Sequence, residues 1–245
     1  MIYYGNNDYR DYLAHHGVLG MHWGIRRYQP YSVKPRKSGK GGKEIGEARE
    51  PGTDKKHIVE QKEYVSNLSK ELNSEWDYGV LLDGKKITEE QLSNFDWKKY
   101  RTIPLDTLYK QKIGVCWDFV NYQHDRLKQA GIPDESWLLI MDLSSKETPD
   151  RIITHTFTTF TLDDKMYWLE SSLWSDRGVH EISSPEEVFK KVANNYTSEK
   201  KPYSVFKYNP EGMDKGLTDQ EFFDKATEDN WVADYNEEEL DKDKQ

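Results

Sequence analysis

Apolar residues recur at helical spacing in two stretches of the chain. The first predicts a helix over residues 56–75 with one apolar side. The apolar positions on that side are Ile58, Tyr64, Val65, Leu68 and Leu72. The second stretch follows Gly114 and is predicted to end at Gly131, because glycine is typical just past a helix C-terminus and Pro133 comes shortly afterwards.

The second half of the chain contains short runs rich in apolar and β-branched residues, which are typical of strands. Strands are predicted over 137–143, 152–161, 166–171, 179–182 and 203–208. The second and third of these form a hairpin around Asp163 and Asp164. Helices and strands mixed in this way, with a hairpin among them, predict an α+β fold.

Three further helix starts are indicated by capping residues. Thr88 with Gln91, and Thr218 with Glu221, have the spacing of a capping box. The segment 184–187 provides a serine N-cap, a proline at the first helical position and a glutamate at the third. Each of these sites is expected to open a helix.

The chain of 245 residues is long enough for one sizeable core with polar extensions. We divide it into an N-terminal docking or tag segment (1–30), a flexible basic linker (31–53), a folded domain (54–208), and a short helix with an acidic tail (209–245). Four glycines, two prolines and several lysines characterise the linker. The tail from Glu237 to Gln245 is expected to fray.

Charge is spread unevenly along the chain. Residues 1–56 contain 11 Lys+Arg and 6 Asp+Glu, a net +5, so the remainder carries −14 of the total of −9. An acidic body argues against a nucleic-acid-binding core. The basic arm is interpreted first as a solvated linker, with contact to a nucleic acid or an acidic protein as the alternative.

Cys116 is the only cysteine, so no intramolecular disulfide can form. It falls in the first turn of the helix that follows Gly114, on the same side as Val120 and Leu127. Backbone N–H groups and the helix dipole favour the thiolate at that place, and the thiolate is the reactive form of cysteine. The simpler interpretation is a small buried apolar side chain.

His155 and Glu170 are predicted to share one face of the hairpin. A two-residue turn at Asp163 and Asp164 places Glu170 opposite Phe157, and His155 points the same way as Phe157. Diagonal neighbours of this kind lie about 7–8 Å apart, which the side chains can bridge. A three-residue loop would separate them. Taken singly, each could be an ordinary strand residue, but together with Cys116 they suggest nucleophile, base and orienting acid.

The remaining candidates near this group are less distinctive. Gln111 lies five residues before Cys116 and is an oxyanion-donor candidate. Trp117 is expected to pack and is also a substrate-binding candidate, and Asp118 is expected to project toward solvent or a local salt bridge. Among the other histidines, His180 is a weaker rival base.

These residues resemble a known family. The run 114–118 (GVCWD), followed by His155-Thr156-Phe157 and the run 167–170 (YWLE), is similar to bacterial transglutaminase-like proteins of the papain-like superfamily. The resemblance extends from about residue 96 to 192. It implies a transglutaminase-like domain in which the cysteine-bearing helix packs on an antiparallel sheet. It also implies that Cys116, His155 and Glu170 are nucleophile, base and orienter, with glutamate where many members have aspartate.

The segment 16–27 (HGVLGMHWGIRR) resembles an element found in bacteriophage and prophage proteins, often associated with heads or virions. The resemblance suggests a phage origin and a docking or packaging role. His15, His16 and His22 are an alternative metal set, but no cysteine or acidic partner completes it, and three glycines favour a tight turn instead.

The sequence therefore predicts a thiol enzyme of the cysteine protease, amidase or transglutaminase type. A non-catalytic, virion-associated binding protein is the alternative. We expect no metal and no cofactor. The expected partners are a protein or peptide substrate and, through residues 12–30, phage head or other virion proteins. Neither an apolar run near the roughly 18 residues of a membrane span nor a secretory signal is evident. The expected location is therefore the bacterial cytoplasm or the virion.

Overall fold

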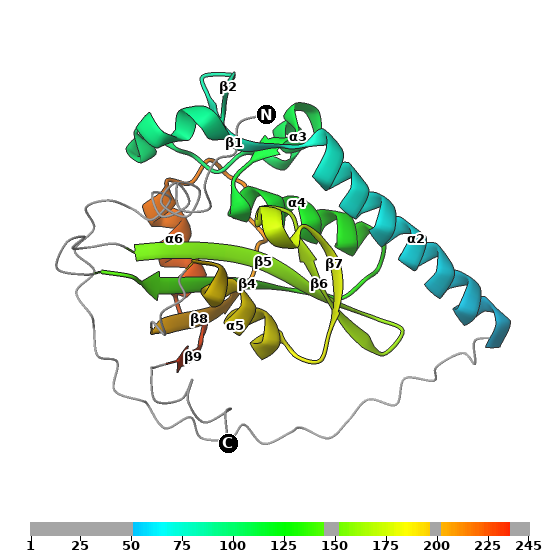
Figure 1. Cartoon of the computed structure of the whole chain (residues 1–245). Helices are drawn as coiled ribbons and strands as arrows, with labels where there is room; N and C mark the ends of the chain where they lie inside the picture. Colours follow the sequence, from blue (N-terminus) through cyan, green and yellow to red (C-terminus); the bar gives the residue numbers. More distant parts are fainter. Residues whose placement is uncertain (1–50, 145–151, 197–201, 236–245) are drawn as a thin grey trace, which may run out of the picture.

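The computed structural model describes residues 51–144, 152–196 and 202–235 (Figure 1). Its helices are α2 (Pro51–Glu75), α3 (Leu105–Gln111), α4 (Cys116–Gln129), α5 (Pro185–Tyr196) and α6 (Asp219–Thr227), with three 3-10 turns, η1 (Glu89–Asn94), η2 (Trp97–Lys99) and η3 (Trp174–Asp176). Its strands are β1 (Asp77–Leu82), β2 (Lys85–Thr88), β3 (Ile113–Gly114), β4 (Asp134–Asp142), β5 (Ile152–Leu162), β6 (Lys165–Glu170), β7 (Gly178–Ile182), β8 (Tyr203–Tyr208) and β9 (Trp231–Tyr235).

The strands form two sheets. The larger has six strands in the order β7-β6-β5-β4-β8-β9, and every neighbouring pair is antiparallel. The smaller has three strands in the order β2-β1-β3, in which β3 pairs parallel with β1 immediately before α4 begins. The predicted α+β class is confirmed.

The six-stranded sheet lies between two layers of helices, each with its own apolar core (Figure 1). On one face, α2, α4 and α6 pack against alternate strand residues such as Phe160 and Leu162 of β5. On the other face, α5 packs against the intervening residues, among them Ile153 and Phe157 of the same strand. The alternation along β5 therefore assigns each side chain to the α4 side or the α5 side.

The hairpin between β5 and β6 has the predicted register. Leu162 pairs with Lys165, and the ladder continues to the pair Thr158–Leu169. Asp163 and Asp164 both have φ of 57°, as a two-residue type I′ turn requires. Because the turn has two residues, His155 and Glu170 emerge on the same face, the one that α5 covers.

Most other predicted elements are also present. The helices after Gly114, at 185 and at 219 are confirmed, as are the five predicted strands. The first helix begins at Pro51, earlier than predicted and within the stretch assigned to the linker. The helix after Thr88 is a short 3-10 helix, although the predicted bond from the Thr88 N–H to Gln91 is present at 3.2 Å.

Several elements were not predicted, namely β1, β2, α3, β3 and β9. Most are short or pair at the edge of a sheet, so their sequences show no strong period. The predicted docking segment 1–30, most of the linker and the acidic tail lie outside the described residues. Within the described ranges, no helix combines the length and apolar character that crossing a membrane requires.

Replacing Asp164 by glycine is expected to stabilise the protein by up to ~1 kcal/mol, because glycine adopts positive φ without steric cost. The free energy of unfolding in urea measures the effect. The control is Thr161→Gly at an exposed position of β5, which is expected to destabilise the protein because that residue is in extended strand. A loss of stability in D164G would contradict the turn assignment.

Candidate active site

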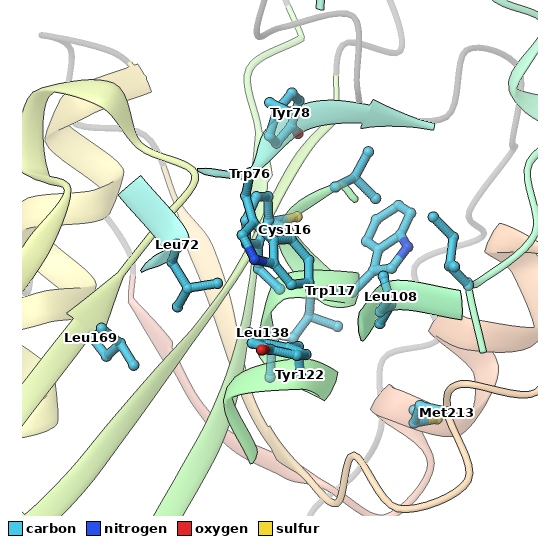
Figure 2. Close-up of a cluster of buried hydrophobic side chains, with 14 of the residues drawn as sticks. Leu72, Trp76, Tyr78, Leu108, Cys116, Trp117, Tyr122, Leu138, Leu169 and Met213 are labelled. Carbon is cyan, nitrogen blue, oxygen red and sulfur yellow. The ribbon is translucent and has the colours of Figure 1, made fainter. Parts of the chain in front are cut away.

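Cys116 is the first residue of α4 and follows β3 directly. Gly114, the last residue of β3, packs so closely on α4 that a Cβ at this position would lie 2.6 Å from the Asp118 Cβ. Glycine is therefore required at 114 to let the start of α4 approach the strand. Cys116 is 6% exposed and lies among Trp76, Tyr78 and Trp117 in the α4-side core (Figure 2).

The start of α4 is held by a buried carboxylate. Asp118 accepts hydrogen bonds from the Val115 N–H at 3.1 Å, the Ile103 N–H at 2.9 Å and the Tyr100 hydroxyl at 2.7 Å. Its side chain is fully buried, so the prediction that Asp118 projects toward solvent is wrong. Burial raises the pKa of Asp118 to about 7, although its three hydrogen bonds act in the opposite direction.

Trp117 belongs to the same anchoring structure. Its indole N–H donates to the Tyr100 hydroxyl at 2.5 Å, and its ring packs against Tyr100, Phe222 and Phe223. The side chain is 3% exposed. The packing role expected of Trp117 is present, whereas the substrate-binding role has no exposed surface to support it.

His155 lies on β5, three residues beyond the last pair of the ladder with β6. At this open end of the hairpin the imidazole contacts groups from both layers. One ring nitrogen, Nε2, lies 3.0 Å from Glu170 Oε2. The Cys116 side chain is close enough to the imidazole to contribute to raising its pKa. The structure therefore brings together the three residues that the sequence singled out.

The Glu170 carboxylate is held by the turn that follows β6. Its Oε1 atom accepts hydrogen bonds from the N–H groups of Ser171, Ser172 and Leu173 at 2.7 to 3.0 Å, and from the Ser172 hydroxyl at 3.1 Å. Its other oxygen, Oε2, is then directed at His155. A buried carboxylate with both oxygens bonded has a single orientation available, which is what an orienting residue requires.

Burial and charge act in opposite directions on the His155–Glu170 pair. Burial alone lowers the pKa of His155, but the Glu170 charge and the hydrogen bonds to Cys116 and Glu170 raise it to about 9. Burial alone raises the pKa of Glu170, but the His155 charge and the backbone N–H donors hold it below its ordinary value of 4.5. At neutral pH the pair is therefore an imidazolium next to a carboxylate.

The first turn of α4 provides the backbone donors that acyl transfer needs. The first bond within the helix runs from the Phe119 N–H to the Val115 carbonyl, so the N–H groups of Cys116, Trp117 and Asp118 precede the helical ladder. Gln111, the predicted oxyanion donor, is the last residue of α3 and is partly exposed. It lies on the segment that leads into β3 and Cys116, and its donor role remains a prediction.

Two other histidines of the described residues, His124 and His180, have different partners. His124 lies 2.8 Å from Asp134, and His180 Nε2 lies 2.6 Å from the Asp176 carbonyl while its ring packs on Trp168. His180 is thus occupied elsewhere. No group of three or more His, Cys, Asp or Glu suited to a metal occurs in the part of the chain that the structure describes.

Sequence reasoning missed two contributors to this site. The sequence predicts that Asp118 projects toward solvent or a local salt bridge, although Gly114, four residues before it, indicates close packing. Tyr196, the last residue of α5, places its hydroxyl 3.2 Å from His155 Nδ1. No local pattern indicates that contact, because 41 residues separate the two in the chain.

Asp118→Asn is expected to change how stability depends on pH. The pKa of Asp118 is raised from 3.8 to about 7 in the folded protein, so the folded state holds this proton more tightly than the unfolded state. The resulting contribution to the free energy of unfolding is fully present below pH 4. It is lost as the pH rises toward 7, by up to ~1.4 kcal/mol per pH unit. The asparagine does not titrate. Urea unfolding between pH 4.5 and 8 should show the stability difference between wild type and D118N shrinking over this window. The exposed Asp106→Asn is the control, and a pH-independent difference for D118N would contradict the assignment.

Glu170→Gln is expected to lower the pKa of His155 from about 9 toward its ordinary value of 6.5, because burial is then opposed by Cys116 alone. Any stability that the charged imidazole contributes is present below pH 6.5 and is lost as the pH rises through 9. NMR titration of the histidine ring signals measures the pKa, with His155→Ala identifying the resonance. The control is Glu181→Gln, an exposed carboxylate on β7. A His155 pKa still near 9 in E170Q would show that Glu170 is not its cause.

Comparison with known proteins adds one match. A family model, described as a family of unknown function (DUF7211), matches residues 6–30. No curated protein matches the chain. The matched segment includes residues 16–27 and lies outside the described residues, so the comparison adds nothing about the folded part of the chain.

Proposed function

We propose that this protein is a thiol-dependent acyl-transfer enzyme that acts on amide or peptide bonds. The observation that carries the proposal is the grouping of three buried side chains: His155 lies 3.0 Å from Glu170 and near enough to Cys116 for the cysteine to influence the pKa of the imidazole. Each member has the surroundings its role requires: a thiol at a helix start, an imidazole between thiol and carboxylate, and a carboxylate fixed by backbone N–H groups.

In the proposed reaction, the Cys116 sulfur attacks the carbonyl carbon of the substrate and forms a C–S bond. The oxyanion is stabilised by N–H groups of the first turn of α4. The C–N bond then breaks, and the amine leaves with the proton of the His155 imidazolium. Water or a second amine attacks the acyl-enzyme, His155 takes its proton, and the C–S bond breaks to release the product and the thiolate. Water gives hydrolysis and an amine gives cross-linking.

The arrangement of elements supports placing the domain near the transglutaminase-like proteins of the papain-like superfamily. The cysteine-bearing helix α4 packs on an antiparallel sheet whose adjacent strands carry the histidine and the acid. We further propose a phage or prophage origin, from the resemblance of the segment 16–27 to elements of phage proteins. That segment would dock the enzyme on a virion component.

The burial of the same group favours a second candidate. Cys116, His155 and Glu170 are 6%, 2% and 1% exposed, and Trp76 and Tyr78 pack in the same cluster as the cysteine (Figure 2). A surface hollow beside β2 and another beside residues 210–214 contain none of the three residues. A domain with its thiol covered in this way could serve in binding alone, as a virion-associated interaction protein.

Alkylation of the single thiol by iodoacetamide, followed by intact mass, distinguishes the two candidates. Since one cysteine gives one adduct, the rate at each pH belongs to Cys116. We expect native protein to react rapidly at pH 6, well below the pKa of about 8.5 of a free thiol. His155→Ala is expected to slow the reaction at pH 6 by a factor on the order of 100, because the proposed base of the cysteine is lost.

His180→Ala is the matched control, since it removes a histidine of the same sheet that contacts neither Cys116 nor Glu170 in the structure. H180A should react like wild type. If Cys116 reacts only after denaturation, or at equal rates in wild type and H155A, the acyl-transfer proposal fails and the binding role takes its place. A rapid native reaction that depends on His155 justifies assays with amide substrates.

A further inference from the structure

The imidazole of His155 has a contact beyond the cysteine and the glutamate. Tyr196, at the C-terminal end of α5, places its hydroxyl oxygen 3.2 Å from His155 Nδ1, and the two ring centroids lie 6.0 Å apart. Tyr196 is 9% exposed and belongs to the α5-side core. The tyrosine therefore reaches the site from the layer opposite α4.

The nitrogen that Tyr196 contacts is the one that Glu170 leaves available. Glu170 lies at Nε2 and Tyr196 at Nδ1, so the two residues hold opposite sides of the ring. A tyrosine hydroxyl can donate to the neutral nitrogen and can accept from the protonated one. It can therefore keep its hydrogen bond in both protonation states of the ring, which a purely donating or purely accepting group cannot.

Tyr196 is also held firmly enough to position another group. The preceding turns of α5 pack on the sheet through Phe189, whose ring lies 5.0 Å from that of Trp137 and 6.1 Å from that of Phe157. Phe157 in turn stacks on His155 at 6.1 Å. The second torsion of a histidine side chain is broad, so packing alone does not fix the ring plane. Hydrogen bonds at both nitrogens do fix it.

We propose that Tyr196 is a positioning residue of the candidate site, whose hydroxyl at Nδ1, together with Glu170 at Nε2, fixes the orientation of the His155 ring while the ring gains and loses its proton. The proposal rests on the proposed function and deepens it by adding a fourth side chain from a separate helix. Tyr196 acts through His155, and no bond to substrate is assigned to it.

The test compares Tyr196→Phe with Tyr203→Phe. Phenylalanine keeps the ring in the core and removes only the hydroxyl, and Tyr203 is a buried tyrosine of the same α5-side cluster that does not contact His155. Both variants and wild type are alkylated with iodoacetamide at pH 6, and the pKa of His155 is measured by NMR. Equal thermal unfolding midpoints for the two variants establish that folding is not the cause of a difference.

We expect Y196F to be alkylated about tenfold more slowly at pH 6 and the pKa of His155 to fall by about one unit. The reason is that a charge-assisted hydrogen bond to the imidazolium is lost. Y203F should match wild type in both measurements. A Y196F variant with unchanged rate and unchanged His155 pKa overturns the proposal. Faster alkylation of Y196F also overturns it, because the hydroxyl would then compete with the thiol for Nδ1.

The His155→Ala variant separates this proposal from the proposed function. If H155A loses reactivity while Y196F keeps it, the cysteine–histidine pair stands and the role of Tyr196 fails. If H155A reacts like wild type, the proposed function fails. The NMR measurement on Y196F then still decides whether the hydroxyl influences the His155 ring.

Discussion

The geometry of the candidate site depends on one buried ion pair, between Glu170 and His155. A carboxylate and an imidazolium removed from water carry a large desolvation cost, which must be offset by close contact and further hydrogen bonds. Here the offset comes from the 3.0 Å contact between the two side chains and from three backbone N–H groups that donate to the other carboxylate oxygen, Oε1. The turn after β6 therefore matters as much as the glutamate itself, because it fixes where the negative charge lies.

The cysteine is positioned by a separate device on the other side of the sheet. Asp118 ties the first turn of α4 to the Ile103 backbone and to the Tyr100 hydroxyl, which in turn accepts from Trp117. Gly114 permits the approach. These contacts of Asp118 and Gly114 place the thiol near the N-terminal end of β5. There β5 no longer pairs with β6, and His155 lies close to the thiol. Side chains from both helical layers therefore lie near the His155 imidazole: Cys116 from α4 and Tyr196 from α5.

A site this well buried has consequences for how a substrate would enter. The thiol belongs to a buried cluster of aromatic side chains that also form the core. One of them, Trp76, has its ring centroid 5.3 Å from that of Phe119 and 4.4 Å from that of Tyr122. Water exclusion strengthens every electrostatic interaction of the pair. In the proposed reaction, the buried side chains around the sulfur would have to move before an amide could reach it, so that reaction would oppose core packing at this end of the domain.

Sequence alone determined the parts of the protein that depend on neighbours along the chain. Helical periodicity located α2 and α4, capping residues located α5 and α6, and the two-residue turn at Asp163 and Asp164 set a register that put His155 and Glu170 on one face. These features follow from local geometry, since turn length and side-chain alternation are fixed over a few residues. Tertiary structure decided the rest. The burial of Asp118, the identity of the rings that pack on Trp117 and the approach of Tyr196 each depend on segments far apart in sequence. A short-range pattern does not indicate which distant segment will cover a residue.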